Sequence, residues 1–202
     1  RAQVNDPSVR WDVVNSVGAM TISRFDEQTG TLARRAAQEF IDKQVKGVVL
    51  DLRDNGGGYL TAAQALASVW LNDQVVVTEK TGGKVVDTVK TERHALLGDM
   101  KTVVLTNGNT ASASEIVAGA LQEYGKATLI GEKTYGKGTV QKIVNLSDGR
   151  ILKVTTARWY TPKGKNITKE GITPDKTIHI TKDDANAGKD TQMEAAQSVL
   201  AS

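Results

Sequence analysis

Two short, largely apolar runs indicate the fold class of this sequence. They lie at residues 47–52 and 101–105 and are rich in Val and Leu. Short apolar runs without polar alternation are typical of strands that are buried on both faces of a parallel sheet. Before the first run, Leu32, Ala36 and Phe40 recur at the spacing of an amphipathic helix. Strand, helix and strand in this order predict βαβ units, and therefore an α/β fold.

The rest of the chain continues this alternation. Further strands are expected at 17–25, 74–79, 85–90, 127–130, 139–146 and 150–160, with hairpins across 82–83 and 147–149. Helices are expected at 29–46, 61–71, 112–124 and 190–200. We therefore predict an α/β core with a mixed, largely parallel sheet flanked by helices. Residues 1–16 are interpreted as an N-terminal segment with one edge strand, 17–182 as the core domain and 183–202 as a C-terminal helical segment.

The composition excludes several kinds of chemistry. The 202 residues include no Cys and two His, His94 and His179, so a cysteine nucleophile and a thiolate metal site are impossible. A Ser-His-Asp triad would have to use one of these histidines, and both are interpreted as structural or solvated. The net charge of +3 is too small to indicate nucleic acid binding. No apolar run reaches the roughly 18 residues that a membrane span requires.

Three unusual loops follow predicted parallel strands. They are the glycine-rich 51–58, the hydroxyl-rich 107–115, which enters a helix, and 131–138, in which Lys137 lies between two glycines. In open α/β sheets, ligands bind at the carboxyl ends of the strands. A helix of about twelve residues rises roughly 18 Å, and a strand of about five residues returns roughly 17 Å. Ser112 and Lys137 are therefore expected to be neighbours.

A serine beside a lysine suggests nucleophilic catalysis. A serine hydroxyl attacks only when a base takes its proton, and a neutral lysine can be that base. A lysine pKa must fall from about 10.4 toward 7–8 for this role, which costs roughly 4 kcal/mol. Gln141 follows Lys137 by four residues on a predicted strand, so we expect it to share a face with Lys137 and to orient the amine. Oxyanion donors are expected from Ala113 N–H and from Gly57 or Gly58 N–H.

Simpler interpretations stand beside this one. Ser112 and Glu115 match a capping box, so the serine could serve only as a helix cap. The 55–58 loop could be a tight turn or an anion-binding nest. Asp51 and Asp54 flank it and could bind a metal, although two carboxylates are a weak signal. Trp159 is interpreted as a core residue or as a wall of an apolar substrate pocket.

Three ordered motifs resemble those of the tail-specific, or C-terminal processing, serine proteases. They are Asp51–Gly58, Asn109–Ile116 and Gly131–Gln141, and the resemblance continues through 158–164 and 171–175. It covers about residues 17–180, and the family's fold resembles that of the ClpP and crotonase class. The resemblance implies a serine endopeptidase that cleaves proteins near their C-termini through an acyl-enzyme. The resemblance implies that Ser112 is the nucleophile, that Lys137 is the general base and that Gln141 supports Lys137. It also implies that the oxyanion donors are Ala113 N–H and the N–H of Gly58, or else of Gly57.

The resemblance also sets expectations for partners and setting. We expect no metal and no organic cofactor, and protein or peptide substrates with apolar C-termini. We expect an extracytoplasmic location, in the bacterial periplasm or cell envelope or alternatively in a chloroplast lumen. Membrane association is expected only through segments absent from this chain, and a homo-oligomer is a possible assembly. Family members usually carry a PDZ domain for substrate capture, and this chain is interpreted as the protease core without one.

Two other functions stay open at the level of sequence. One is a catalytically silent peptide-binding core, in which the glycine loop and a helix N-terminus hold a carboxylate or carbonyl. The other is a crotonase-like acyl-CoA enzyme, which uses the same backbone oxyanion donors. The second gives no reason for Ser112, Lys137 and Gln141 to occur together.

Overall fold

A six-stranded sheet forms the centre of the molecule in a computed structural model, which describes residues 6–145 and 150–201. Its strands run in the order β1-β2-β3-β6-β7-β10. β1 is antiparallel to β2, and every other neighbouring pair is parallel. The predicted α/β fold with a largely parallel sheet is therefore confirmed. The strands are β1 (Val9–Val14), β2 (Val17–Ile22), β3 (Gly47–Asp51), β6 (Thr102–Thr106), β7 (Thr128–Gly131) and β10 (Lys176–Thr177).

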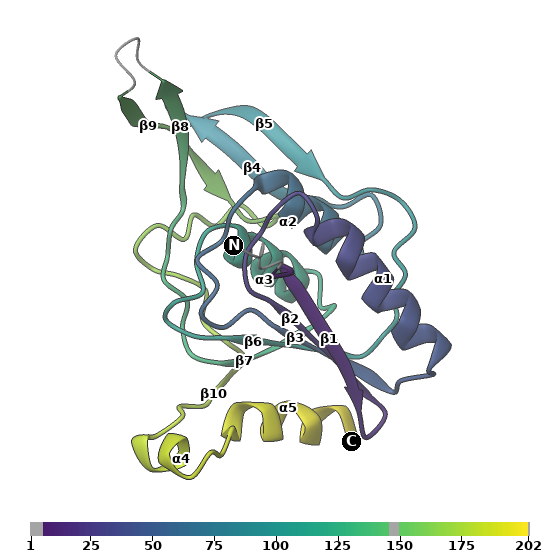
Figure 1. Ribbon diagram of the computed structural model, residues 1–202. Coiled ribbons are helices and arrows are strands. Elements are labelled where there is room, and N and C mark those ends of the chain that lie inside the picture. The colour runs from purple at the N-terminus through teal and green to yellow at the C-terminus, as the bar shows by residue number, and fades with distance from the viewer. Residues whose placement is uncertain (1–5, 146–149, 202) are drawn as a thin grey trace, which may run out of the picture.

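Helices cover both faces of this sheet (Figure 1). α1 (Thr29–Asp42), α2 (Leu60–Ala67) and α3 (Ala113–Glu123) pack on one face, and α5 (Thr191–Ala201) packs on the other. Strand alternation divides the core accordingly, because Val48 and Leu50 of β3 join the larger cluster while Val49 joins the cluster beneath α5. Burial on both faces explains why β3 and β6 read as continuous apolar runs.

Four strands form a second, antiparallel sheet, which projects from the core at the top of Figure 1. They run in the order β5-β4-β9-β8. Their bounds are β4 (Val75–Thr81), β5 (Lys84–Lys90), β8 (Thr139–Asn145) and β9 (Ile151–Tyr160). The sequence pattern predicts all four strands but not their separation from the central sheet. The turn expected at 147–149 lies outside the described residues.

Two helices end earlier than their apolar periodicity predicts. α1 stops at Asp42 rather than residue 46, because Gln44 adopts a φ of 53° that no right-handed helix can continue. α2 stops at Ala67 rather than residue 71. Ser68 follows its last residue, and the Ser68 hydroxyl donates a hydrogen bond to Gln64 O at 2.7 Å. A short helix, α4 (Lys182–Asn186), precedes α5. Among the described helices, none combines the length and the apolar character needed to cross a bilayer.

Candidate active site

The three unusual loops meet at the carboxyl end of the central sheet, where one cavity of about 330 Å³ opens. The cavity brings together five of the six predicted site residues: Gly58, Ser112, Ala113, Lys137 and Gln141. The sixth, Gly57, lies directly behind Ser112. The remaining walls are mostly apolar and are formed by Tyr59, Leu60, Val77, Glu79, Ile116, Thr139, Val140 and Trp159.

Ser112 has an unusual backbone conformation at the N-terminus of α3. Its φ of 57° and ψ of −117° lie in a region that residues other than glycine rarely adopt. A residue that only caps a helix is normally extended. The surrounding loop holds this conformation, because Asn55 O accepts both Ala111 N–H at 3.0 Å and the Ser114 hydroxyl at 2.9 Å. Strain that is held in this way is a common property of functional residues.

The glycine loop places backbone donors beside Ser112. A Cβ on Gly57 would lie 2.8 Å from Ser112 Cβ and 2.9 Å from Ala113 N, so only glycine fits at this position, where φ is +100°. Gly57 N–H already donates to Asn55 Oδ1 at 2.9 Å. In contrast, no described residue accepts a hydrogen bond from Gly58 N–H or Ala113 N–H. Of the two glycines, Gly58 is therefore the one with a free donor at the cavity.

Glu115 is a buried carboxylate that joins the serine loop to the lysine loop. Its side chain is 0% exposed. Oε2 accepts Ser112 N–H at 2.8 Å and Lys137 N–H at 2.9 Å, while Oε1 accepts Gly136 N–H at 2.8 Å and the Thr134 hydroxyl at 2.5 Å. The sequence pattern identified Glu115 only as a capping-box partner. The bond to Ser112 N–H confirms that part of the motif, and the contacts with the second loop could not be inferred from spacing.

Lys137 is fixed through its backbone and not through its amine. Its N–H donates to Glu115, and its carbonyl accepts Trp159 Nε1–H at 2.9 Å. The half-buried side chain lines the cavity. Within the described residues, the amine makes no hydrogen bond to the Ser112 hydroxyl or the Gln141 amide. The three groups therefore share a cavity without a hydrogen bond between the amine and either of the other two.

The route by which Gln141 reaches the cavity differs from the prediction. Lys137 lies before β8, which begins at Thr139, so the two residues do not share one face of a strand. The pairing of β8 with β9 shifts between Val140 and Gln141. Such a bulge interrupts strand alternation. As a result, Thr139, Val140 and Gln141 all line the cavity.

The two aspartates considered as metal ligands make other contacts. Asp54 Oδ1 accepts the side-chain amides of Asn109 at 2.8 Å and Asn107 at 2.9 Å, and these hydrogen bonds lower the pKa of Asp54. Asp51 pairs with Arg53 at 2.6 Å. In the described parts of the chain, no group of three His, Cys, Asp or Glu residues could hold a metal ion. Asp54 therefore links its loop to the 107–115 loop, and Asp51 pairs with a residue of its own loop.

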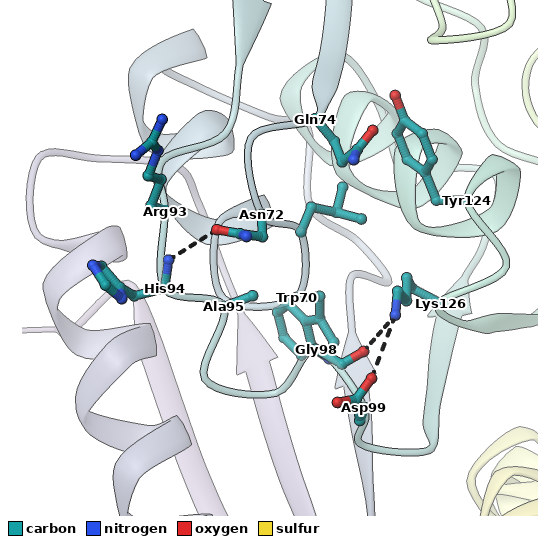
Figure 2. Close-up of a pocket in the computed structure, with 11 residues that line it drawn as sticks. Trp70, Asn72, Gln74, Arg93, His94, Ala95, Gly98, Asp99, Tyr124 and Lys126 are labelled. Atoms are coloured by element: carbon teal, nitrogen blue, oxygen red, sulfur yellow. Dashed lines mark hydrogen bonds and ion pairs between the residues drawn. The ribbon is translucent and has the colours of Figure 1, made fainter.

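A larger cavity of about 670 Å³ lies at the opposite end of α3, beside Tyr124 (Figure 2). Figure 2 shows that its basic side chains, Arg93, His94 and Lys126, point in different directions. Lys126 Nζ donates to Gly98 O at 2.7 Å. The residues that line it include no serine or threonine, and its pair of opposite charges, Lys126 with Asp99 at 3.8 Å, is already matched within the chain. The smaller cavity around Ser112 is therefore the better candidate for an active site.

Comparison with known proteins places this chain in a class of serine proteases. The chain is 36% identical over 184 residues to a probable CtpA-like serine protease of Staphylococcus epidermidis, and 37% identical over 184 residues to one of Staphylococcus aureus. These alignments cover 90% of this chain and 38% and 37% of the relatives. The chain thus spans less than half the length of the curated relatives it matches.

Solved structures and a family match agree with this class. The photosystem II D1 C-terminal processing protease superposes with a TM-score of 0.80 at 32% identity, over 89% of this chain and 50% of that one. A putative S41 protease from Bacteroides fragilis shares the fold, with a TM-score of 0.81 at 23% identity, over 100% of this chain and 59% of that one. Residues 16–178 match Peptidase family S41. The chain belongs to peptidase family S41.

Proposed function

We propose that this chain is a serine endopeptidase core in which Ser112 is the nucleophile and Lys137 the general base. The observation that carries the proposal is the convergence at one cavity of a serine in a strained conformation, a lysine side chain and two free backbone donors, Ala113 N–H and Gly58 N–H. Membership in family S41 and similarity to CtpA-like serine proteases support the reaction class.

Acylation begins when Ser112 Oγ attacks the carbonyl carbon of the scissile peptide bond. The serine proton passes to the neutral Lys137 amine, and the carbonyl oxygen becomes an oxyanion. Ala113 N–H, at the positive end of the α3 dipole, and Gly58 N–H would donate to this oxyanion. The tetrahedral intermediate then collapses, the C–N bond breaks, and the leaving amine takes the proton from Lys137. The product is an ester between the substrate and Ser112.

Deacylation repeats these steps with water. Lys137 takes a proton from the water, whose oxygen attacks the ester, and the same two donors stabilise the second oxyanion. Collapse breaks the ester bond and returns the proton to Ser112 Oγ. Gln141, which lines the same cavity, would orient the lysine amine without adding a charge. No step needs a histidine, a cysteine or a metal ion.

The substrate and setting form a second level of the proposal. We propose protein or peptide substrates cleaved near their C-termini, because one similar structure is named a C-terminal processing protease. The family resemblance is the basis for proposing that these C-termini are apolar. We also propose an extracytoplasmic site of action, in the periplasm or cell envelope, on the basis of the family resemblance. A homo-oligomeric assembly belongs to the same set of proposals.

A silent peptide-binding core is the second candidate. The observation that favours it is that the Lys137 amine makes no hydrogen bond to the Ser112 hydroxyl in the described structure. Catalytic hydrogen bonds often tighten only when substrate binds, so a closed dyad would need peptide in the cavity. This candidate predicts reversible peptide binding without covalent modification of Ser112.

Cleavage of a loosely folded protein with an apolar C-terminus tests the proposal. Ser112→Ala and Lys137→Ala should each reduce the rate by at least about 100-fold, because each removes an essential proton-transfer partner. Lys133→Ala is the matched control, since this lysine lies in the same loop but is exposed. Near-full activity in either of the first two variants would exclude the proposed mechanism.

A further inference from the structure

Glu79 introduces a carboxylate into the otherwise mostly apolar wall of the catalytic cavity. It lies on β4 and lines the cavity that holds Ser112 and Lys137. In the sheet register it faces Trp159 of β9 on one side and Asp87 of β5 on the other. Directly opposed residues of antiparallel strands project to the same face. Trp159 also lines the cavity, so the strand pairing directs Glu79 toward the space where substrate would lie.

This carboxylate has no positive partner in the described structure. Neither a hydrogen bond nor an ion pair reaches it from any described residue. The other acids near the site are satisfied: Glu115 accepts four hydrogen bonds, and Asp51 pairs with Arg53. Burial, and to a smaller extent the charge of Asp87, raises the pKa of Glu79. A carboxylate in this position would be stabilised by a cation that the free chain does not supply.

Lys137 is the basic side chain of the same cavity, but it does not pair with Glu79. No ion pair joins the two within the described residues. A stable pair would hold the lysine protonated and would remove the proposed base. The cation that neutralises Glu79 should therefore come from outside the chain.

We infer that Glu79 is a specificity-determining residue, which selects substrates with Lys or Arg at the residue whose carbonyl Ser112 attacks. The inference rests on the proposed function. Lysine and arginine have an apolar stem and a cationic end. The stem would pack on the apolar walls formed by Leu60, Val77 and Trp159, and the cationic end would reach Glu79. Burial in this cavity strengthens such a pair relative to one in water.

Matched peptides test the inference directly. The two peptides differ only at the residue whose carbonyl Ser112 attacks, which is lysine in one and norleucine in the other. This pair compares a charged side chain with an uncharged one of similar length. Glu79→Gln keeps the shape of the side chain and removes its charge. Glu170→Gln is the control, because it makes the same substitution at an exposed residue that does not line the cavity.

Both cleavage and binding are measured. Relative to the native chain, the ratio of kcat/KM for lysine over norleucine should fall at least tenfold in Glu79→Gln and stay within twofold in Glu170→Gln. The same change is expected for peptide affinity in a Ser112→Ala background, where no cleavage occurs. Glu79→Leu provides a second neutral variant if Glu79→Gln folds poorly.

The two readouts separate this inference from the proposed function. An unchanged lysine-to-norleucine affinity ratio in Glu79→Gln or Glu79→Leu would overturn the role of Glu79, whether or not the chain cleaves peptides. A chain that cleaves neither peptide but shows the predicted affinity change would support Glu79 as a selectivity residue. That result would contradict only the proposed catalysis.

Discussion

Replacing Glu115 with glutamine should destabilise the whole candidate site. The new NH2 group donates hydrogen bonds where the carboxylate oxygen accepted them. If it takes the Oε2 position, Ser112 N–H and Lys137 N–H both lose their acceptor; at Oε1, Gly136 N–H loses its acceptor while the Thr134 hydroxyl can rotate. An unsatisfied buried donor costs about 1–3 kcal/mol. The expected loss in the free energy of unfolding is therefore about 2–4 kcal/mol.

Urea denaturation and thermal melting measure this loss. A domain of 150–250 residues loses about 2–4 °C in Tm per kcal/mol, so Glu115→Gln should melt about 5–15 °C below the native chain. Covalent labelling of Ser112 by a phosphonate should slow in parallel, because both loops shift. Glu170→Gln is the control, since its side chain is exposed. A Glu115→Gln variant within about 0.5 kcal/mol of the native chain would show that these hydrogen bonds do not hold the site together.

Three further changes test separate parts of the structure. Gly57→Ala should slow labelling of Ser112 at least tenfold, because the added Cβ would collide with the serine loop. Gly56→Ala is the control, since its Cβ would meet open space, and it should label at the native rate. Equal labelling rates in the two variants would argue against the close approach of Gly57 to Ser112. Arg53→Ala should cost about 2–3 kcal/mol by leaving buried or half-buried carboxylates unpaired, including Asp190 at 2.8 Å. The rate of amide hydrogen exchange in α5 should rise in Arg53→Ala. An unchanged exchange rate would show that the Arg53–Asp190 ion pair does not anchor this helix. Burial raises the pKa of Asp190, but hydrogen bonds from Arg53 and from a backbone N–H outweigh this and lower it below 3.8. The contribution of Asp190 to folding stability should therefore be complete above about pH 4 and should be lost as the pH falls through its folded pKa. Equilibrium unfolding at several pH values should show this dependence, and Asp190→Asn should remove it.

The central sheet could be predicted because the burial of its strands leaves a pattern within short stretches of the sequence. β3 and β6 are buried on both faces, so their apolar runs lack alternation and indicate a parallel sheet. Parallel strands end at the same edge, which is why the loops with Ser112 and Lys137 were expected to meet. The cavity that both residues line agrees with that expectation.

Other features depend on tertiary contacts that spacing does not encode. Glu115 matches a helix cap, and only the approach of residues 134–137 makes it a link between two loops. Glu79 has the pattern of an ordinary strand residue until the pairing of β4 with β9 places it beside Trp159. The bulge at Val140 and Gln141 likewise has no signature in the sequence, and it decides which side chains reach the cavity.

Mass spectrometry of the chain after exposure to a serine-reactive phosphonate tests the proposed mechanism most directly. One adduct is expected on Ser112 and none in Ser112→Ala, and labelling should be at least about 100-fold slower in Lys137→Ala, where the base is missing. Lys133→Ala should label at the native rate. Labelling at another serine, or equal rates with and without the Lys137 side chain, would contradict the Ser112–Lys137 dyad.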